Sequence, residues 1–280
     1  MRLRASSLAL ASLATLLGVL VSDAPSQAAE LKWTELEPGI EYATAEAPGP
    51  RPLPLAIDDH LHLVRVDPKR RSLEAIMAGA GDGRARTAAQ WCRERRLAVA
   101  INMGMFETDR RTNTGYARSP GYVNNGHWAG KYKAALGFGA LKKNAPALVI
   151  SDLDDPAAKA RLADYGTVIQ NLRLIKAGHS VWEQQERRWS EAAVGVDRQG
   201  RLVFIFSRYP YTMKELNDLL LALPLALESA MHMDGGPPAS LSIHAGGVNL
   251  DLNGSFETGA LESDGVPAQL PIPNVLGVRR

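Results

Sequence analysis

The sequence predicts an α+β fold, a single domain built on a mixed, largely antiparallel sheet that is flanked by helices. Short apolar segments with strand-like patterns outnumber segments with helical spacing. Several of them are joined by turns that contain Gly, Asn or Asp, which is typical of antiparallel pairs. Strands and helices do not alternate regularly, so a doubly wound parallel sheet is the second choice.

The composition is that of an ordinary folded protein, with 45% hydrophobic and 22% charged residues in a chain of 280. The formal net charge is +2 and the basic residues are not clustered, which argues against a nucleic-acid partner. Cys92 is the only cysteine, so the chain has no internal disulfide and no multi-cysteine metal site. No cofactor is expected.

The first 28 residues have the pattern of a secretory signal peptide. Arg2 and Arg4 give a basic start, an uncharged apolar run covers residues 8–21, and small residues precede a cleavage site near Ala28. The run is shorter than the roughly 20 apolar residues that a membrane-spanning helix needs. We therefore expect a secreted or periplasmic protein without a membrane span after cleavage.

Two segments make up the rest of the chain. Residues 29–57 are rich in Pro, and we expect an extended lead-in there. Residues 58–280 carry the strand and helix patterns and form the expected domain.

In the first half of this domain, residues 60–66 alternate between polar and apolar side chains, as in a half-buried strand. Residues 73–77 are the expected partner strand after a turn. Residues 87–96 show helical spacing and begin with Thr, a favourable N-cap, and residues 97–101 form a short buried strand. The polar segment 107–133 is expected to be a functional loop.

In the second half, residues 191–196 and 202–207 form an expected hairpin. Thr212 and Glu215 form a capping box at the start of a helix over 213–223. Further short strands are expected at 147–151, 168–171, 172–175, 230–233, 239–244 and 271–278. The strand at 239–244 should return beside the strand that precedes it.

Three expected strands end in polar turns that contain Gly, at residues 101–106, 233–236 and 253–259. Glycine lets the backbone approach a ligand closely or adopt a positive φ. An Asn or Asp at each strand end then points at the opening. Each turn alone is weak evidence, but their joint occurrence in one domain indicates a site.

Four motifs follow one another in the chain: Asn-x-Gly-Met-Phe at 102–106, Ala-Val-Gly-Val-Asp at 193–197, the capped helix, and Met-Asp-Gly-Gly at 233–236. Their order resembles the phosphodiester glycosidase family, and in particular an exported bacterial branch of it. The resemblance extends from about residue 60 to the C-terminus. It implies hydrolysis of a glycosyl phosphodiester, and thus a carbohydrate or sugar-phosphate substrate. Glu191 stands where relatives often have an arginine.

Glycoside cleavage commonly uses two carboxyl groups. Asp234 is the first candidate, because it ends a strand and two glycines open the space beside it. Glu257 and Glu107 compete for the second role, and Asn102 would orient a sugar hydroxyl or a phosphate oxygen. Candidate cations for the phosphate are Arg188, Arg208 and Lys131, and further candidate contacts to the substrate are Gly104, Phe106, Glu107, Gly235, Gly236 and Ser240.

Two other functions remain open. A non-catalytic carbohydrate- or envelope-binding protein on the same scaffold is the main alternative to an exported hydrolase. A metallohydrolase is the third hypothesis, because His60 and His62 form a His-x-His pair beside Asp58 and Asp59. No later histidine pattern completes such a site, so no metal is predicted.

Overall fold

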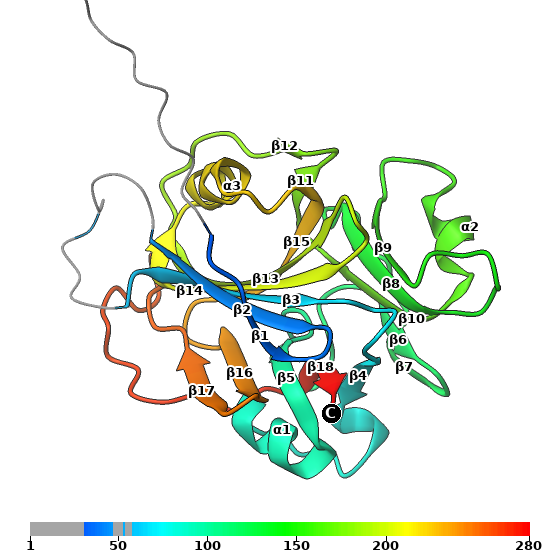
Figure 1. The fold of residues 1–280 in the computed structure, drawn as a ribbon, viewed down its shortest axis with the longest axis horizontal. Helices are drawn as coiled ribbons and strands as arrows, with labels where there is room; N and C mark the ends of the chain where they lie inside the picture. The colour runs from blue at the N-terminus through cyan, green and yellow to red at the C-terminus, as the bar shows by residue number, and fades with distance from the viewer. Residues whose placement is uncertain (1–30, 47–52, 54–57) are drawn as a thin grey trace, which may run out of the picture.

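The computed structural model describes residues 31–46, 53 and 58–280 (Figure 1). The predicted signal peptide, and the parts of the lead-in at 29–30, 47–52 and 54–57, lie outside the described residues. None of the described helices has the length and apolar character needed to cross a lipid bilayer.

Three antiparallel sheets make up the described part of the chain, so the fold is richer in strands than the expected α+β class with one mixed sheet. Sheet I has eight strands in the order β1-β2-β3-β14-β13-β15-β11-β12. Their bounds are Thr34–Glu37 (β1), Ile40–Glu46 (β2), His60–Val66 (β3), Leu202–Tyr211 (β14), Trp189–Asp197 (β13), Leu227–Gly235 (β15), Arg173–Lys176 (β11) and His179–Ser180 (β12).

Sheets II and III have five strands each. Sheet II is ordered β7 (Tyr122–Asn125), β6 (Ala117–Ser119), β10 (Tyr165–Asn171), β8 (Ala134–Ala140) and β9 (Leu148–Asp152). Sheet III is ordered β17 (Val248–Asn253), β16 (Ser240–Ala245), β5 (Leu97–Asn102), β18 (Asn274–Arg279) and β4 (Leu73–Met77). In Figure 1, sheet I crosses the middle of the molecule, sheet III lies below it and sheet II to its right.

The three sheets share one apolar core, to which β3, β5 and β8 contribute the fully buried Val64, Ile101 and Leu136. Each sheet also has a helix on another face. Helix α3 (Met213–Ala222) packs on sheet I, α1 (Ala88–Arg95) on sheet III and α2 (Ala158–Leu162) on sheet II (Figure 1). A short 3₁₀ turn, η1 (Ala78–Ala80), follows β4.

Both predicted helix starts are confirmed. The Thr87 hydroxyl accepts a 3.1 Å bond from the Gln90 amide, and the Gln90 side chain accepts one of 2.9 Å from the Thr87 amide. Thr212 and Glu215 form the same reciprocal pair at α3. These bonds satisfy amides that the first helical turn leaves without partners. The hairpin of β13 and β14 is also confirmed.

Two expected strand pairings are wrong. Strand β4 pairs with β18 rather than β3, because both edges of β3 are already occupied by β2 and β14. Strand β16 does not return beside β15, whose edges are occupied by β13 and β11, and it pairs with β5 and β17. Both connections therefore carry the chain from sheet I to sheet III.

Several strands were not identified by the sequence analysis, among them β8, β12, β17 and those of two further segments. Residues 34–37 and 40–46, within the expected lead-in, form β1 and β2 and join sheet I through β3. The polar segment 107–133 contains β6 and β7. The described part of the lead-in is therefore integrated into sheet I.

Candidate active site

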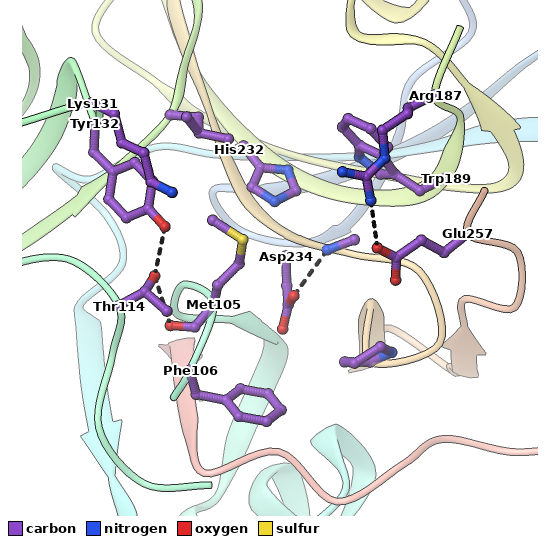
Figure 2. Close-up of a pocket in the computed structure, with 13 residues that line it drawn as sticks. Met105, Phe106, Thr114, Lys131, Tyr132, Arg187, Trp189, His232, Asp234 and Glu257 are labelled. Carbon is purple, nitrogen blue, oxygen red and sulfur yellow. Dashed lines mark hydrogen bonds and ion pairs between the residues drawn. The ribbon is translucent and has the colours of Figure 1, made fainter. Parts of the chain in front are cut away.

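A pocket of about 450 Å³ opens where the three sheets meet. Figure 2 shows His232 and Asp234 between two walls, one with Lys131, Tyr132 and Thr114 and the other with Arg187, Trp189 and Glu257. The lining residues are Met105, Phe106, Thr114, Lys131, Tyr132, Leu172, Arg187, Trp189, His232, Asp234, Gly235, Pro238 and Glu257. The pocket combines apolar surface with groups of both charges.

The Asp234 carboxyl group is buried near the end of β15, and only 5% of the residue is exposed. Its Oδ2 accepts a 2.9 Å hydrogen bond from Asn102 Nδ2, and its Oδ1 accepts one of 2.9 Å from the Gly235 amide. Asn102 itself is held by the Ser240 amide, which donates to its Oδ1 over 2.7 Å. The ends of β5 and β15 thus fix the carboxyl group in one orientation.

Burial raises the pKa of Asp234 from 3.8 to about 7. The positive charge of His232 and the hydrogen bonds from Gly235 and Asn102 oppose this shift, but they do not overcome the loss of solvation. A carboxyl group with a pKa near neutrality can both accept and release a proton under ordinary conditions.

His232 lies two residues before Asp234 on β15 and is also buried. Its Nδ1 lies 2.6 Å from Oε1 of Glu191, a residue of the neighbouring strand β13 that is 1% exposed. The indole N–H of Trp189 donates to Oε2 of Glu191 over 2.7 Å. The pair is thus enclosed in the sheet, and the imidazole ring lies at the pocket wall.

The charge of Glu191 raises the pKa of His232. Burial works in the opposite direction, because it disfavours the imidazolium, but the carboxylate in hydrogen-bond contact outweighs it. Asp234 and Glu257 add to the increase from a greater distance.

The two glycines after Asp234 make room for pocket side chains. A Cβ on Gly235 would lie 2.5 Å from Cδ1 of Trp189, so the indole can pack there only against glycine. Gly236 has a φ of +66°, and a Cβ there would lie 2.7 Å from Oε2 of Glu257. Gly235 therefore leaves the space that Trp189 occupies, and Gly236 leaves the space that Glu257 occupies.

Glu257 lies in the segment after β17 and forms a bridge with residue 189. Its Oε1 lies 3.3 Å from the guanidinium of Arg187, which is an exposed residue. Ser190 anchors the segment, because its hydroxyl accepts hydrogen bonds from the amides of Ser255 and Phe256. The second predicted carboxyl group thus belongs to the pocket.

The opposite wall is held by Gln170 of β10. Its Oε1 accepts from the amides of Tyr116 and Ala129, and its Nε2 donates to the carbonyls of Ala129 and Tyr132. Between the last two residues lies Lys131, whose side chain lines the pocket. A single buried amide therefore fixes the backbone that presents this lysine.

Of the other predicted residues, Phe106 and Lys131 line the pocket. Five do not: Gly104, Glu107, Arg188, Arg208 and Ser240. Ser240 acts through its amide, which holds Asn102. Arg188 forms a two-pronged ion pair with Glu215 of α3, Arg208 is bound by Asp264 and by backbone carbonyls, and Glu107 is exposed.

The histidine pair at the start of β3 lies outside the pocket. Asp58 contacts both rings, through Nδ1 of His60 and Nε2 of His62, and the Tyr42 hydroxyl contacts Nδ1 of His62. Ligand atoms of Asp58, Asp59 and His60 lie within 4.8 Å of one another, which is close enough for a shared cation. Both nitrogens of His62, however, are already used by protein groups.

Sequence reasoning overlooked His232, Glu191, Trp189 and Arg187 as site residues. A signal for two of them was present. Glu191 is a charged residue inside an apolar strand, and a buried charge requires a partner. His232 shares a strand face with Asp234, because alternate residues of a strand point to the same side.

The fold is similar to that of solved proteins. A hypothetical protein from Synechocystis matches with a TM-score of 0.61 and 17% identity, over 90% of this chain and 64% of the other, slightly under two thirds. The catalytic domain of zebrafish N-acetylglucosamine-1-phosphodiester alpha-N-acetylglucosaminidase, auto-inhibited by its pro-peptide, matches with a TM-score of 0.58 and 17% identity, over 86% of this chain and 88% of the other. No curated protein sequence matches the chain.

The family comparison confirms the resemblance that the order of the motifs indicates. The model of the phosphodiester glycosidase family matches residues 95–279, which include every residue that lines the pocket. The chain therefore belongs to the phosphodiester glycosidase family.

Proposed function

We propose that the chain is an exported hydrolase that cleaves the bond between the anomeric carbon of a sugar and a phosphodiester oxygen. Family membership and the name of the zebrafish relative support this class of substrate. The observation that carries the proposal is the buried carboxyl group of Asp234, fixed at the pocket by Asn102 and titrating near neutral pH. Export is supported by the signal-peptide pattern of residues 1–28.

The reaction needs few groups, because a phosphate leaves as a stable anion. A water oxygen forms a bond to the anomeric carbon, the bond from that carbon to the phosphate oxygen breaks, and the phosphate departs with the electron pair. The ionised Asp234 accepts the proton that the water loses and releases it to solvent. Glu257 stabilises the positive charge that develops on the sugar ring.

Two positions support this assignment of roles. Asp234 has both oxygens held by hydrogen bonds, so its proton-accepting geometry is set before a substrate arrives. Glu257 lies on the wall with Trp189 and Arg187, and Phe106 adds aromatic surface to the same pocket. These apolar rings suit the hydrophobic face of a sugar.

Turnover of an N-acetylglucosamine 1-phosphodiester by wild type and Asp234→Asn tests the proposal. We expect kcat/KM to fall by at least about a hundredfold, the usual contribution of a general base. Asp218→Asn, an exposed residue of α3, is the matched control and should keep full activity.

Two results would contradict the proposal. Equal turnover by wild type and Asp234→Asn would remove Asp234 from the mechanism. Tight binding without turnover, over a panel of glycosyl phosphodiesters and neutral glycosides, would instead establish the non-catalytic carbohydrate-binding protein.

A further inference from the structure

One ring nitrogen of His232 makes no hydrogen bond within the described residues, although the residue is almost completely buried. Its Nδ1 is bound by Glu191, whereas Nε2 has no hydrogen-bond partner among the described residues. The residue is only 3% exposed, yet its ring lines the pocket. Nε2 is not one of the fully buried polar atoms that lack a partner, so it is accessible, and a ligand in the pocket can bind it.

Glu191 is positioned to keep this imidazole charged. One carboxylate oxygen contacts Nδ1 and the other accepts the hydrogen bond from the Trp189 indole. Trp189 is in turn packed on Gly235, where any larger residue would displace it. Burial raises the pKa of Glu191, and the charge of His232 and the two hydrogen bonds oppose that shift. The contact between the two side chains therefore stabilises the carboxylate and the imidazolium together.

Five charged or titratable groups face His232. Glu191 comes from β13, Asp234 from β15, Glu257 from the segment after β17, Arg187 from the segment before β13 and Lys131 from the segment before β8. Glu257 is balanced by Arg187, at 3.3 Å, and Glu191 by His232. When Asp234 is protonated, Lys131 leaves the pocket with one surplus positive charge.

We propose that His232, held as an imidazolium by Glu191, binds the phosphate of the substrate through Nε2 and makes the site selective for anionic over neutral glycosides. This inference rests on the proposed function for the identity of the anion. The ring donates Nε2–H to a phosphoryl oxygen, a charge-assisted hydrogen bond. Lys131, which lines the same pocket, is a second positive group for the phosphate.

Sulfate is a suitable probe, because its charge does not change between pH 5 and 9. Its dissociation constant is measured by calorimetry for wild type, Glu191→Gln and His232→Gln. At pH 7.5 we expect Glu191→Gln to bind at least about tenfold more weakly, because an imidazole with an ordinary pKa of about 6.5 is only about one tenth protonated there, and burial lowers that fraction further. As the pH is lowered to 5.5, the imidazole of Glu191→Gln gains its proton, so the difference should narrow.

Glu191 and the charge of His232 both affect the pKa of Asp234, so the same comparison is made in the Asp234→Asn background, where this titration is absent. His232→Gln should bind sulfate weakly at both pH values. Asp251→Asn is the matched control, because Asp251 pairs with His244 on sheet III, outside the pocket. It should behave like wild type at both pH values.

Either of two results would overturn the inference: sulfate affinity unchanged in His232→Gln, or equal affinity of Glu191→Gln and wild type at pH 7.5. If Glu191→Gln does not fold, ¹⁵N NMR of the wild-type histidine rings decides, since sulfate must then shift the ring nitrogens of His232. Sulfate binding needs no turnover. Intact binding with no hydrolysis of any phosphodiester would therefore refute the proposed function and leave the anion site standing.

Discussion

The side-chain amide of Asn102 donates a 2.9 Å hydrogen bond to the carboxyl group of Asp234 and so joins strands of two different sheets. The same amide nitrogen donates to the carbonyl of Pro238 over 3.0 Å. Asn102 therefore couples the position of the carboxyl group to the turn that follows it.

Asn102→Ala should cost both stability and activity. It leaves the Ser240 amide without its side-chain partner, and a buried unsatisfied group costs about 1–3 kcal/mol, whereas the Pro238 carbonyl keeps the hydrogen bond from the Ser240 hydroxyl. Because a hydrogen bond to the carboxylate is lost, the pKa of Asp234 should rise further, and the pH profile of kcat/KM should move to higher pH. Urea unfolding and pH–rate profiles test this. Asn249→Ala, an exposed residue of β17, should change neither.

Asp234 should make the folded protein less stable as the pH rises. Its pKa is about 7 in the folded state against 3.8 ordinarily, so between these values the folded protein keeps a proton that the unfolded chain has released. The free energy of unfolding should therefore fall from pH 4 to pH 7 and then level off. Asp234→Asn removes this pH dependence. Its free energy of unfolding, relative to that of wild type, should therefore be higher at pH 8 than at pH 4 by at most about 4 kcal/mol. Parallel curves for the two proteins in urea unfolding would refute the shift.

Gly236→Ala should impair the site beyond the strain of its backbone. Both Gly236 and Gly247 have positive φ values, of 66° and 82°, but a Cβ on Gly247 meets nothing within 4 Å. Gly247→Ala should thus lose about 1 kcal/mol of stability and no activity. Gly236→Ala displaces Glu257 as well, and we expect a tenfold or larger fall in kcat. Similar kcat values for the two variants would show that catalysis does not depend on the position of Glu257.

The neighbours Arg187 and Arg188 should have separable roles. Arg187 lines the pocket and is exposed, so Arg187→Gln should raise KM several-fold and barely alter stability. Arg188 is bound to Glu215 at the start of α3, outside the pocket lining. Arg188→Gln should cost about 1 kcal/mol and leave kcat/KM unchanged. Steady-state kinetics and thermal unfolding of both variants test these roles. A higher KM for Arg188→Gln, with lower stability for Arg187→Gln, would mean that the two roles are assigned to the wrong residues.

Gln170→Leu should loosen the wall that carries Lys131. The amides of Tyr116 and Ala129 and the carbonyl of Tyr132 lose the Gln170 side chain as partner, whereas the Ala129 carbonyl keeps the Tyr132 amide. Hydrogen exchange of residues 126–133 should therefore accelerate, and KM should rise. Gln199→Leu, an exposed residue in the hairpin turn, is the control. Unchanged exchange in Gln170→Leu would mean that the wall is held by other contacts.

Local patterns predicted local structure well. The strand at 60–66 and the Thr87 and Thr212 caps depend on neighbours within a few residues, and each is confirmed in the structure. The expected half-burial of that strand is wrong, because its two faces are both buried, in two different apolar clusters. Asp234 was chosen because it ends a strand beside two glycines, and Glu257 because it lies in a turn that contains Gly; both line one pocket. Asn102 does not line the pocket, but it is hydrogen-bonded to Asp234.

The remainder depends on which strand edges are already occupied and on pairs far apart in the chain. Strands β4 and β16 belong to sheet III and not to sheet I, because both edges of their expected partners, β3 and β15, are already paired. Glu191 and His232 are 41 residues apart, so no local pattern links them. Arg188 rather than Arg187 was chosen as the phosphate contact. Neighbouring residues of an extended chain point to opposite sides, so the choice required a register that the sequence does not provide.

The position of β18 determines when the site can assemble. This strand, formed by residues 274–279, lies between β5 and β4 in sheet III, and the carbonyl of Asn274 accepts the amide of Met103, next to Asn102. Strand β5 therefore lacks one neighbour until translation has passed residue 279. Because the contacts that complete the sheet are so distant in sequence, folding should be slow and should follow synthesis, not accompany it.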